Sequence, residues 1–511
     1  MTLTGDTLLA VSPILMGVAA AVAALLLDAV DRRRAAIVVG SLLLAAASAM
    51  GASVALDMTQ QMVLDGVLVV GDWASWASAL VFGLAALVLA GDMDHLLLTR
   101  RGGGVAALYC LAAVASSVLA ATTDLIMFVI ALETVAVCSY ALVASAGTRA
   151  SREASMKYVV QGAAVTGILL YAAATLFGEF GGGSSFMDLV MPLSQAADVG
   201  EGVVYGPAVL VVLGLVIALG YKLSAFPLHF WAPDAFESAP PGAGAFMASA
   251  PKAAALFFAT VAVGQLLGAY REQWSALFAV LAVGSIVYGN LSGLKQVSFT
   301  RMLAYSGIAQ GGYALSGLAV MASGLQADSL GAFPVRVFAV TYSLGAVGAF
   351  LGARALRDYD PDWDGTIVGM AGLASRRPWL AAGLAVCLLS LTGIPLTAGF
   401  WGKFWVFLDV VRNGWTALAV VGFIGSVVSF GYYGSVMRAM YLDFGKPVEV
   451  GDVSQDGDDS TEAEVTGGAG KRRRPAVSSA ARACVVAAAL VLIAGVTPLV
   501  TGMDAFLRAL I

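Results

Sequence analysis

The sequence has few charged residues. Only 12% of its 511 residues are Asp, Glu, Lys or Arg, whereas 59% are hydrophobic. A soluble domain carries about 25% charged residues, and a protein core cannot hold this much apolar surface. Part of the surface must therefore face lipid, where backbone groups have to be hydrogen-bonded within the protein. Long unbroken apolar runs favour helices over the alternating pattern of a membrane barrel.

The chain also lacks the residue patterns that hold cofactors. It has two histidines and four cysteines, and the cysteines lie in apolar runs without Cys-x-x-Cys spacing. There is no P-loop and no glycine-rich dinucleotide motif after a strand. We therefore expect no cofactor, no metal and no nucleic acid to bind this chain, and we expect lipid as its solvent.

The apolar runs predict an all-α integral membrane protein with about fourteen transmembrane helices. The expected spans are 8–28, 35–56, 70–91, 104–121, 124–146, 153–178, 205–228, 243–268, 273–293, 301–323, 333–357, 378–410, 414–443 and 478–500. Counted along these spans, loops after odd-numbered helices hold 18 Lys and Arg residues and the other loops hold 3. By the positive-inside rule, the odd loops are cytoplasmic and both termini lie on the outer face.

Four ionisable residues remain at membrane depth. Glu133 is nine residues past Asp124, which is about 13 Å along a helix. Lys222, Lys252 and Lys403 also lie inside apolar spans. Each such group costs about 2.5–3.5 kcal/mol to insert, and these groups usually mark ion or proton pathways. Three cations cannot all be paired with one carboxylate, and a buried lysine can shed its proton. A proton relay is the resulting hypothesis, with a static hydrogen-bonding role for Glu133 as the alternative.

Two further residues are weaker candidates. Lys157 lies only about one turn inside the expected cytoplasmic edge, so it either joins the relay or simply extends to the membrane surface. His229 lies at the cytoplasmic end of the seventh span. It is either a proton carrier or a hydrogen-bonded histidine that holds a loop.

The seventh and twelfth spans are expected to be broken. Pro227 follows Lys222 by five residues, and Gly393 and Pro395 precede Lys403. Proline removes a backbone donor, and broken helices survive in membranes where they line a hydrated cavity. Interrupted spans in corresponding positions of two halves are typical of inverted-repeat transporters. This predicts two inverted repeats of five helices, spans 4–8 and 9–13.

These boundaries divide the chain into five parts. We expect an N-terminal three-helix segment at 1–103, repeats at 104–268 and 273–443, a polar cytoplasmic linker at 445–477 and a C-terminal helix at 478–511. The linker runs from acidic to basic, which is typical of a solvated segment, and docking to a partner is the alternative.

Three stretches carry a family resemblance. YKLSAFPLHFWAPDAFESAP, the following SAPKAAA, and LTGIPLTAGFWGKFWVF resemble the antiporter-like subunits of respiratory complex I and the Mrp cation/proton antiporters. The matches run from about residue 105 to residue 445. REASMKYVVQGA is similar to the N-type branch. Lys403 argues against the M-type branch, where the resemblance implies a glutamate, and a chain ending about ten residues after its last span argues against the L-type.

The resemblance implies a role for each matching residue. Glu133 and Lys222 would form the paired groups of one half-channel, Lys252 would be the central relay, and Lys403 would connect to the other half-channel or the exit. The chain would then be a proton-translocating subunit of NADH:quinone oxidoreductase in the bacterial inner membrane. NADH, FMN, iron–sulfur clusters and quinone would bind in partner subunits, and the neighbours would include a second antiporter-like subunit and the small membrane subunits.

Two alternatives stay open. The chain could belong to an Mrp-type sodium/proton antiporter or a membrane-bound hydrogenase, which share these motifs. It could also be a structural membrane subunit whose proton pathway is inactive.

Overall fold

The computed structural model describes residues 5–180, 183–191, 206–266, 271–323, 331–442 and 477–501. Across these ranges the protein is an all-helical bundle with one short hairpin, β1 (Gln61–Val63) and β2 (Leu68–Val70). The helices are α1 (Gly5–Ala29), α2 (Arg33–Asp57), α3 (Asp72–Gly91), α4 (Met93–Leu98), α5 (Gly102–Ala121), α6 (Leu125–Ala144), α7 (Arg149–Phe180), α9 (Gly206–Lys222), α10 (Trp231–Ser238), α11 (Pro241–Ala248), α12 (Ala250–Gln265), α13 (Arg271–Gly293), α14 (Phe299–Ser323), α15 (Phe333–Tyr359), η2 (Val368–Met370), α16 (Leu373–Arg376), α17 (Pro378–Thr392), α18 (Ala398–Arg412), α19 (Thr416–Tyr441) and α20 (Ser479–Thr501). The predicted linker at 445–477 lies almost entirely outside the described residues.

Eleven helical segments in the described ranges are long and apolar enough to cross a membrane, so the chain is a multi-pass membrane protein. They coincide with eleven of the fourteen expected spans. The other three expected spans have a different form. The seventh and twelfth are interrupted, and α14 is 25 residues long but carries polar side chains along its length.

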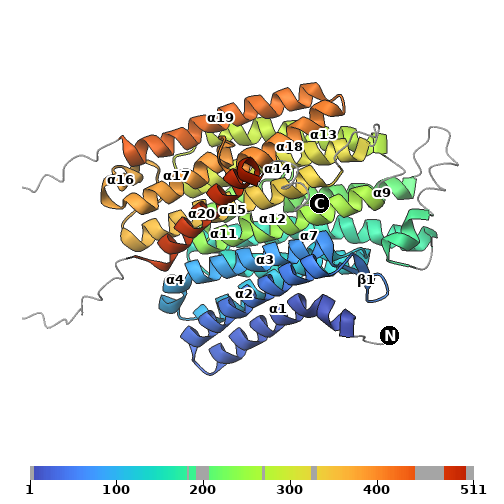
Figure 1. Ribbon diagram of the computed structural model, residues 1–511, viewed down its shortest axis with the longest axis horizontal. Helices are drawn as coiled ribbons and strands as arrows, with labels where there is room; N and C mark the ends of the chain where they lie inside the picture. Colours follow the sequence, from blue (N-terminus) through green and yellow to red (C-terminus); the bar gives the residue numbers. More distant parts are fainter. Residues whose placement is uncertain are drawn as a thin grey trace, which may run out of the picture.

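The long helices run side by side along one direction (Figure 1). α1 and α2 lie at one edge and α19 lies at the opposite edge, with α12 and α15 between them. α20 crosses this layer and packs on α15, α17, α18 and α3, so the C-terminal helix ties the N-terminal segment to the second half.

α14 is the helix that joins the two halves of the bundle. It packs on α10 and α12 from the first half and on α13, α15, α18 and α19 from the second. The contact with α13 is very close, because a Cβ on Gly289 would lie 2.6 Å from the backbone nitrogen of Ala309. Small residues allow such close packing between membrane helices, where no hydrophobic effect drives association.

Three spans are interrupted beside a lysine. α9 ends at Lys222 and α10 begins nine residues later, while α17 ends at Thr392 and α18 begins at Ala398. Between α11 and α12, Ser249 leaves helical geometry with ψ −86°. The third interruption was not expected, although Pro251 in the first turn of α12 is the local reason for it.

Candidate functional site

Lys252 is held by backbone carbonyl groups. Its side chain is buried, and its Nζ donates to the carbonyl oxygens of Leu223 and Gly307, each at 3.4 Å. Leu223 directly follows α9, where the free carbonyl groups of a helix C-terminus carry partial negative charge. Among the described residues, no carboxylate oxygen lies within 4.0 Å of this ammonium group. Its charge is therefore compensated by dipoles instead of a fixed ion pair.

Lys403 is held in the same way, but more tightly. Its buried Nζ donates to the carbonyl oxygens of Leu391 and Thr392, at 2.9 Å each, at the C-terminus of α17. The ammonium also lies 4.5 Å from the centre of the Tyr313 ring, within range of a cation–π interaction. Gly393, with φ +91°, turns the chain away at this point. A left-handed residue after a helix is usually glycine, because a Cβ would be strained there.

Glu133 and Lys222 lie near each other without direct contact. Lys222 is buried in the last turn of α9 and interacts electrostatically with Glu133 on α6, but the two are not within 4.0 Å. The Glu133 carboxylate accepts a hydrogen bond from Thr166 on α7. Lys222 and Lys252 also repel each other, since both are cations in a shared interior. The sequence-predicted pair is thus part of a group of three charges.

One polar side chain on α14, that of Gln310, lies between Lys252 and Lys403. Gly307, which accepts from Lys252, is three residues from Gln310 and so on the same helix face. The Nε2 of Gln310 donates to the carbonyl of Leu391 at 2.8 Å, and Leu391 also accepts from Lys403. Sequence reasoning missed Gln310, although a glutamine in an otherwise apolar span was a visible signal.

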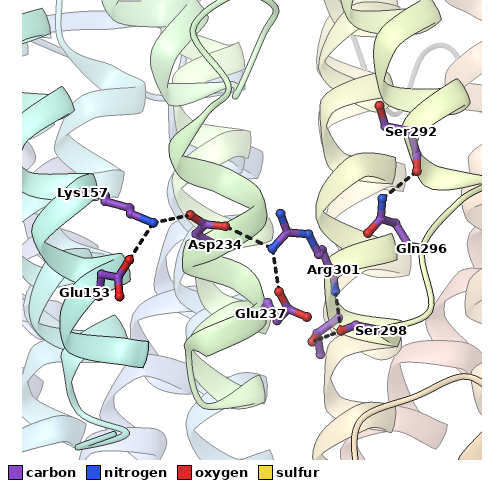
Figure 2. Close-up of polar contacts among 9 residues, drawn as sticks. Glu153, Lys157, Asp234, Glu237, Ser292, Gln296, Ser298 and Arg301 are labelled. Atoms are coloured by element: carbon purple, nitrogen blue, oxygen red, sulfur yellow. Dashed lines mark hydrogen bonds and ion pairs between the residues drawn. The ribbon is translucent and has the colours of Figure 1, made fainter. Parts of the chain in front are cut away.

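A chain of ion pairs lies beside the interruption between α9 and α10 (Figure 2). Lys157 contacts Glu153 at 3.0 Å and Asp234 at 3.1 Å, while Arg301 contacts Asp234 at 3.1 Å and Glu237 at 2.7 Å. The five side chains come from α7, α10 and α14. The side chain of Lys157 is half exposed.

His229 is buried in the turn between α9 and α10. Its ring contacts the rings of Phe226, Phe230 and Tyr288, with centroids 4.3–5.6 Å apart. Neither ring nitrogen has a hydrogen-bond partner in the part of the chain that the structure describes. The alternative of a histidine that holds a loop by hydrogen bonds therefore has no such bond to support it there.

Two buried carboxyl groups were also missed. Asp92 follows α3 directly, accepts from the hydroxyl of Tyr109 at 3.3 Å, and lies 3.8 Å from the Nε of Arg354. Burial raises the pKa of Asp92 to about 7, against the opposing effect of Arg354. Asp409 is buried on α18 six residues after Lys403, and its carboxylate accepts from Asn413 at 3.2 Å. The described residues contain no cluster of ligands that could hold a metal ion.

Comparisons with known proteins identify the family. A family model described as "NADH:quinone oxidoreductase/Mrp antiporter, TM" matches residues 122–429. NADH-quinone oxidoreductase subunit N of Sphingopyxis alaskensis is 33% identical over 411 residues, which cover 79% of this chain and 82% of that protein. Subunit N of Moorella thermoacetica is 35% identical over 411 residues, covering 79% and 81%. This chain belongs to the subunit N family of NADH:quinone oxidoreductases.

Solved structures agree with this family. A chain of respiratory complex I from Thermus thermophilus with bound aureothin superposes with a TM-score of 0.73 and 26% identity, covering 96% of this chain and 98% of that one. A chain of the Mrp complex from Dietzia superposes with a TM-score of 0.76 but 20% identity, covering 97% and 96%, so it shows a shared fold alone. As a subunit N family member, the chain is an antiporter-like, proton-translocating subunit of a translocase and part of a respiratory complex I assembly.

Proposed function

We propose that protons cross this subunit through Glu133, Lys222, Lys252 and Lys403. Glu133 and Lys222 form the paired groups of the first half-channel, Lys252 is the central relay and Lys403 leads toward the exit. The observation that carries the proposal is the way Lys252 and Lys403 are held. Both ammonium groups are buried against backbone carbonyls, with no carboxylate of the described residues within 4.0 Å, so either can lose its proton without leaving an anion behind.

The spacing of the charges suggests how one proton displaces another. Lys222 is stabilised by Glu133 and destabilised by Lys252, and such interactions are strong in a low-dielectric interior. A rearrangement that weakens the Glu133–Lys222 interaction makes the Lys222 proton less stable and favours its transfer toward Lys252. Coupled groups of this kind titrate as a set rather than singly.

Lys157 and His229 belong to the entrance of this pathway in our proposal. Lys157 connects the exposed Glu153 to Asp234 on the segment that follows the interruption. His229 lies in the turn that leads from α10 back to Lys222, and a neutral imidazole can accept and release a proton near neutral pH.

The proposed topology has fourteen crossings. Spans 4–8 and 9–13 form two inverted five-helix repeats within 104–268 and 273–443, after the three-helix segment 1–103 and before the linker and the helix in 478–511. Three interrupted spans beside buried lysines support it. Both termini lie on the outer face of a bacterial inner membrane, and the linker at 445–477 is cytoplasmic. The ends of α7, α10 and α14 that carry the ion-pair chain are then cytoplasmic.

The proposed partners follow from the family. A second antiporter-like subunit and the small membrane subunits lie beside this chain. NADH, FMN, iron–sulfur clusters and quinone bind elsewhere in the complex, and this chain performs no redox step.

Replacing Lys252 or Glu133 by alanine in the whole oxidoreductase tests the proposal. NADH-driven proton uptake into inverted membrane vesicles should fall about tenfold or more in each variant, with quinone-linked turnover reduced alongside it. Lys295→Ala is the matched control, because Lys295 is an exposed lysine outside the spans. The amount of assembled complex is measured in each case. Unchanged pumping and turnover in Lys252→Ala and Glu133→Ala would show that the relay hypothesis is wrong.

A further inference from the structure

Five charged side chains connect three helices beside the α9–α10 interruption. Lys157 and Glu153 lie one helical turn apart on α7, Asp234 and Glu237 lie three residues apart on α10, and Arg301 begins α14 (Figure 2). One Asp234 oxygen accepts from Lys157 and the other accepts from Arg301. Asp234 is therefore held between α7 and α14, and these ion pairs add to the apolar packing of α10, whose Trp231 and Phe236 are buried.

α10 is mechanically linked to the proposed relay. It is eight residues long, which is about 12 Å. At its first residue, the Nε1 of Trp231 donates to the carbonyl oxygen of Tyr221 at 3.1 Å. Tyr221 directly precedes Lys222, and the carbonyl of Leu223 directly after it accepts from Lys252. A movement of α10 therefore reaches the backbone directly before Lys222, next to the carbonyl that accepts from Lys252.

The packing of Trp231 makes this link rigid. Its ring stacks on that of Tyr158 on α7, with centroids 4.0 Å apart and an interplanar angle of 2°. The hydroxyl of Tyr221 in turn donates to the carbonyl of Tyr158 at 2.9 Å. The charged end of α10 is thus joined to Lys222 through ring stacking and hydrogen bonds.

The charged groups are accessible to solvent. The exposed fractions of their side chains run from 30% for Asp234 to 63% for Glu153. Ion pairs with this exposure are screened by water, so the chain of pairs adds little to the stability of the fold. For the same reason it can open and close at small cost. Three carboxylates face two cations, so one added proton brings the five groups to neutrality.

Few charged or titratable side chains lie near Asp234 on the helices that pack against α10. α7 presents Glu153, Lys157 and the buried Tyr158, α6 presents Tyr140, and α14 presents Arg301 and Tyr305. Behind them, Tyr305 and Tyr288 have ring centroids 6.2 Å apart, and Tyr288 contacts His229. His229 is a buried titratable group with no hydrogen-bond partner among the described residues, and it stands behind the charged chain.

We propose that the ion-pair chain Glu153–Lys157–Asp234–Arg301–Glu237 is the cytoplasmic proton gate of this subunit. The gate is closed while Arg301 and Lys157 hold Asp234 between them. A proton that binds Asp234 or Glu237 removes the negative charge that holds Arg301, and the contact between Arg301 and α10 opens. When the proton moves inward, the carboxylate is restored and Arg301 returns. Arg301 is a positioning residue that transfers no proton itself. This inference rests on the proposed function.

The Arg301→Gln variant of the whole complex in inverted vesicles, whose cytoplasmic face is outside, tests the gate. Two quantities are measured between pH 6 and 8.5 outside: protons taken up per NADH oxidised, and proton leak through the inhibited complex under an imposed pH gradient. Loss of the cation should leave the gate open. We expect an uptake ratio at least twofold lower, a leak several-fold higher, and a flatter pH profile than in the natural complex. Arg301→Lys should restore most of the coupling.

Arg376→Gln is the matched control, because this arginine lies on short α16 and donates to the carbonyl of Ala371 nearby. A wild-type leak and pH profile in Arg301→Gln would overturn the gate. The gate would also be overturned if NADH turnover and proton uptake fell by the same factor while the pH profile stayed unchanged. That result would mean that Arg301 has only a structural role. If Arg301→Gln prevents assembly, Glu237→Gln replaces it, and an unshifted profile there overturns the gate equally. Normal pumping by Lys252→Ala would instead contradict the proposed function itself.

Discussion

The interruptions at Lys252 and Lys403 use the same chemistry with different strength. Both lysines donate to backbone carbonyl groups, but Lys252 does so at 3.4 Å and Lys403 at 2.9 Å. Both Lys403 acceptors lie at the end of one helix, α17, and the ammonium has an aromatic ring nearby. The two Lys252 acceptors are on separate elements.

The surroundings of the two lysines differ as well. The interior around Lys252 also contains Lys222, which interacts with Glu133, whereas the neutral groups Tyr313 and Gln310 lie near Lys403. A weakly held cation among other charges responds to small changes in their positions. A tightly held cation among neutral groups keeps its place. The comparison indicates that proton transfer is controlled around Lys252, whereas Lys403 keeps a constant position in the pathway.

The largest expected difference comes from Lys252→Met and Lys403→Met. Both variants should lose proton pumping about tenfold or more. Lys403→Met should also destabilise the subunit by about 1.5–3 kcal/mol, because it removes two charge-assisted hydrogen bonds from buried carbonyls. Lys252→Met should cost much less, since its bonds are long. The difference is measured by heating the solubilised complex and determining how much of this subunit remains bound at each temperature.

Lys295→Met controls for the loss of a lysine at an exposed site. The comparison between the two halves fails if Lys252→Met destabilises the subunit as much as Lys403→Met does.

A smaller effect is expected from Gly393→Ala, which disturbs the second interruption without removing a charge. With φ +91°, an alanine is strained by about 1–2 kcal/mol, and its Cβ would also lie 3.0 Å from Cδ of Lys403. We expect lower stability and reduced pumping, because the Lys403 stem has to shift.

Gly414→Ala is the matched variant, because Gly414 has φ +83° with nothing within 4 Å of an added Cβ. It should carry the backbone strain alone and pump normally. Equal pumping in the two alanine variants would mean that the position of Lys403 is not critical.

The effect of Gln310→Leu should be smaller again. The change removes the hydrogen bond to the Leu391 carbonyl, worth about 0.5–1.5 kcal/mol, while Lys403 still donates to the same oxygen. Pumping should fall a few-fold, since Gln310 is the polar side chain between Lys252 and Lys403. Gln296→Leu is the control, because the Gln296 amide bonds only within its own segment, to the Ser292 carbonyl at 2.8 Å. A normal number of protons pumped per NADH in Gln310→Leu would show that this glutamine is not part of the pathway.

The sequence predicted the helices well because lipid imposes a simple rule on them. Long apolar runs end where polar groups begin, so most boundaries differ from the structure by only a few residues. Prolines beside Lys222 and Lys403 also predicted the interruptions there. Pro251, one residue before Lys252, carried the same signal for α12 and was not used.

What binds the lysines could not be predicted from the sequence. The acceptors are backbone carbonyls of Leu223, Gly307, Leu391 and Thr392, and every residue has such a group. Only the path of the interrupted chain selects them. The ion-pair chain was hidden for a related reason. Asp234 and Arg301 are 67 residues apart and look like ordinary loop charges until α10 and α14 are packed together.

The smallest expected effect comes from a comparison between Glu153, at the end of the proposed gate, and Asp234, at its centre. Glu153→Gln removes an exposed pair between residues one turn apart, which contributes little because water screens it. Lys157 keeps its contact with Asp234, so pumping should stay within about twofold of normal. Asp234→Asn removes the negative charge that both cations share, and its proton leak should be clearly larger in the same vesicles. A leak in Glu153→Gln that matched Asp234→Asn would show that the five charges act as one surface patch, without the central position that the structure gives Asp234.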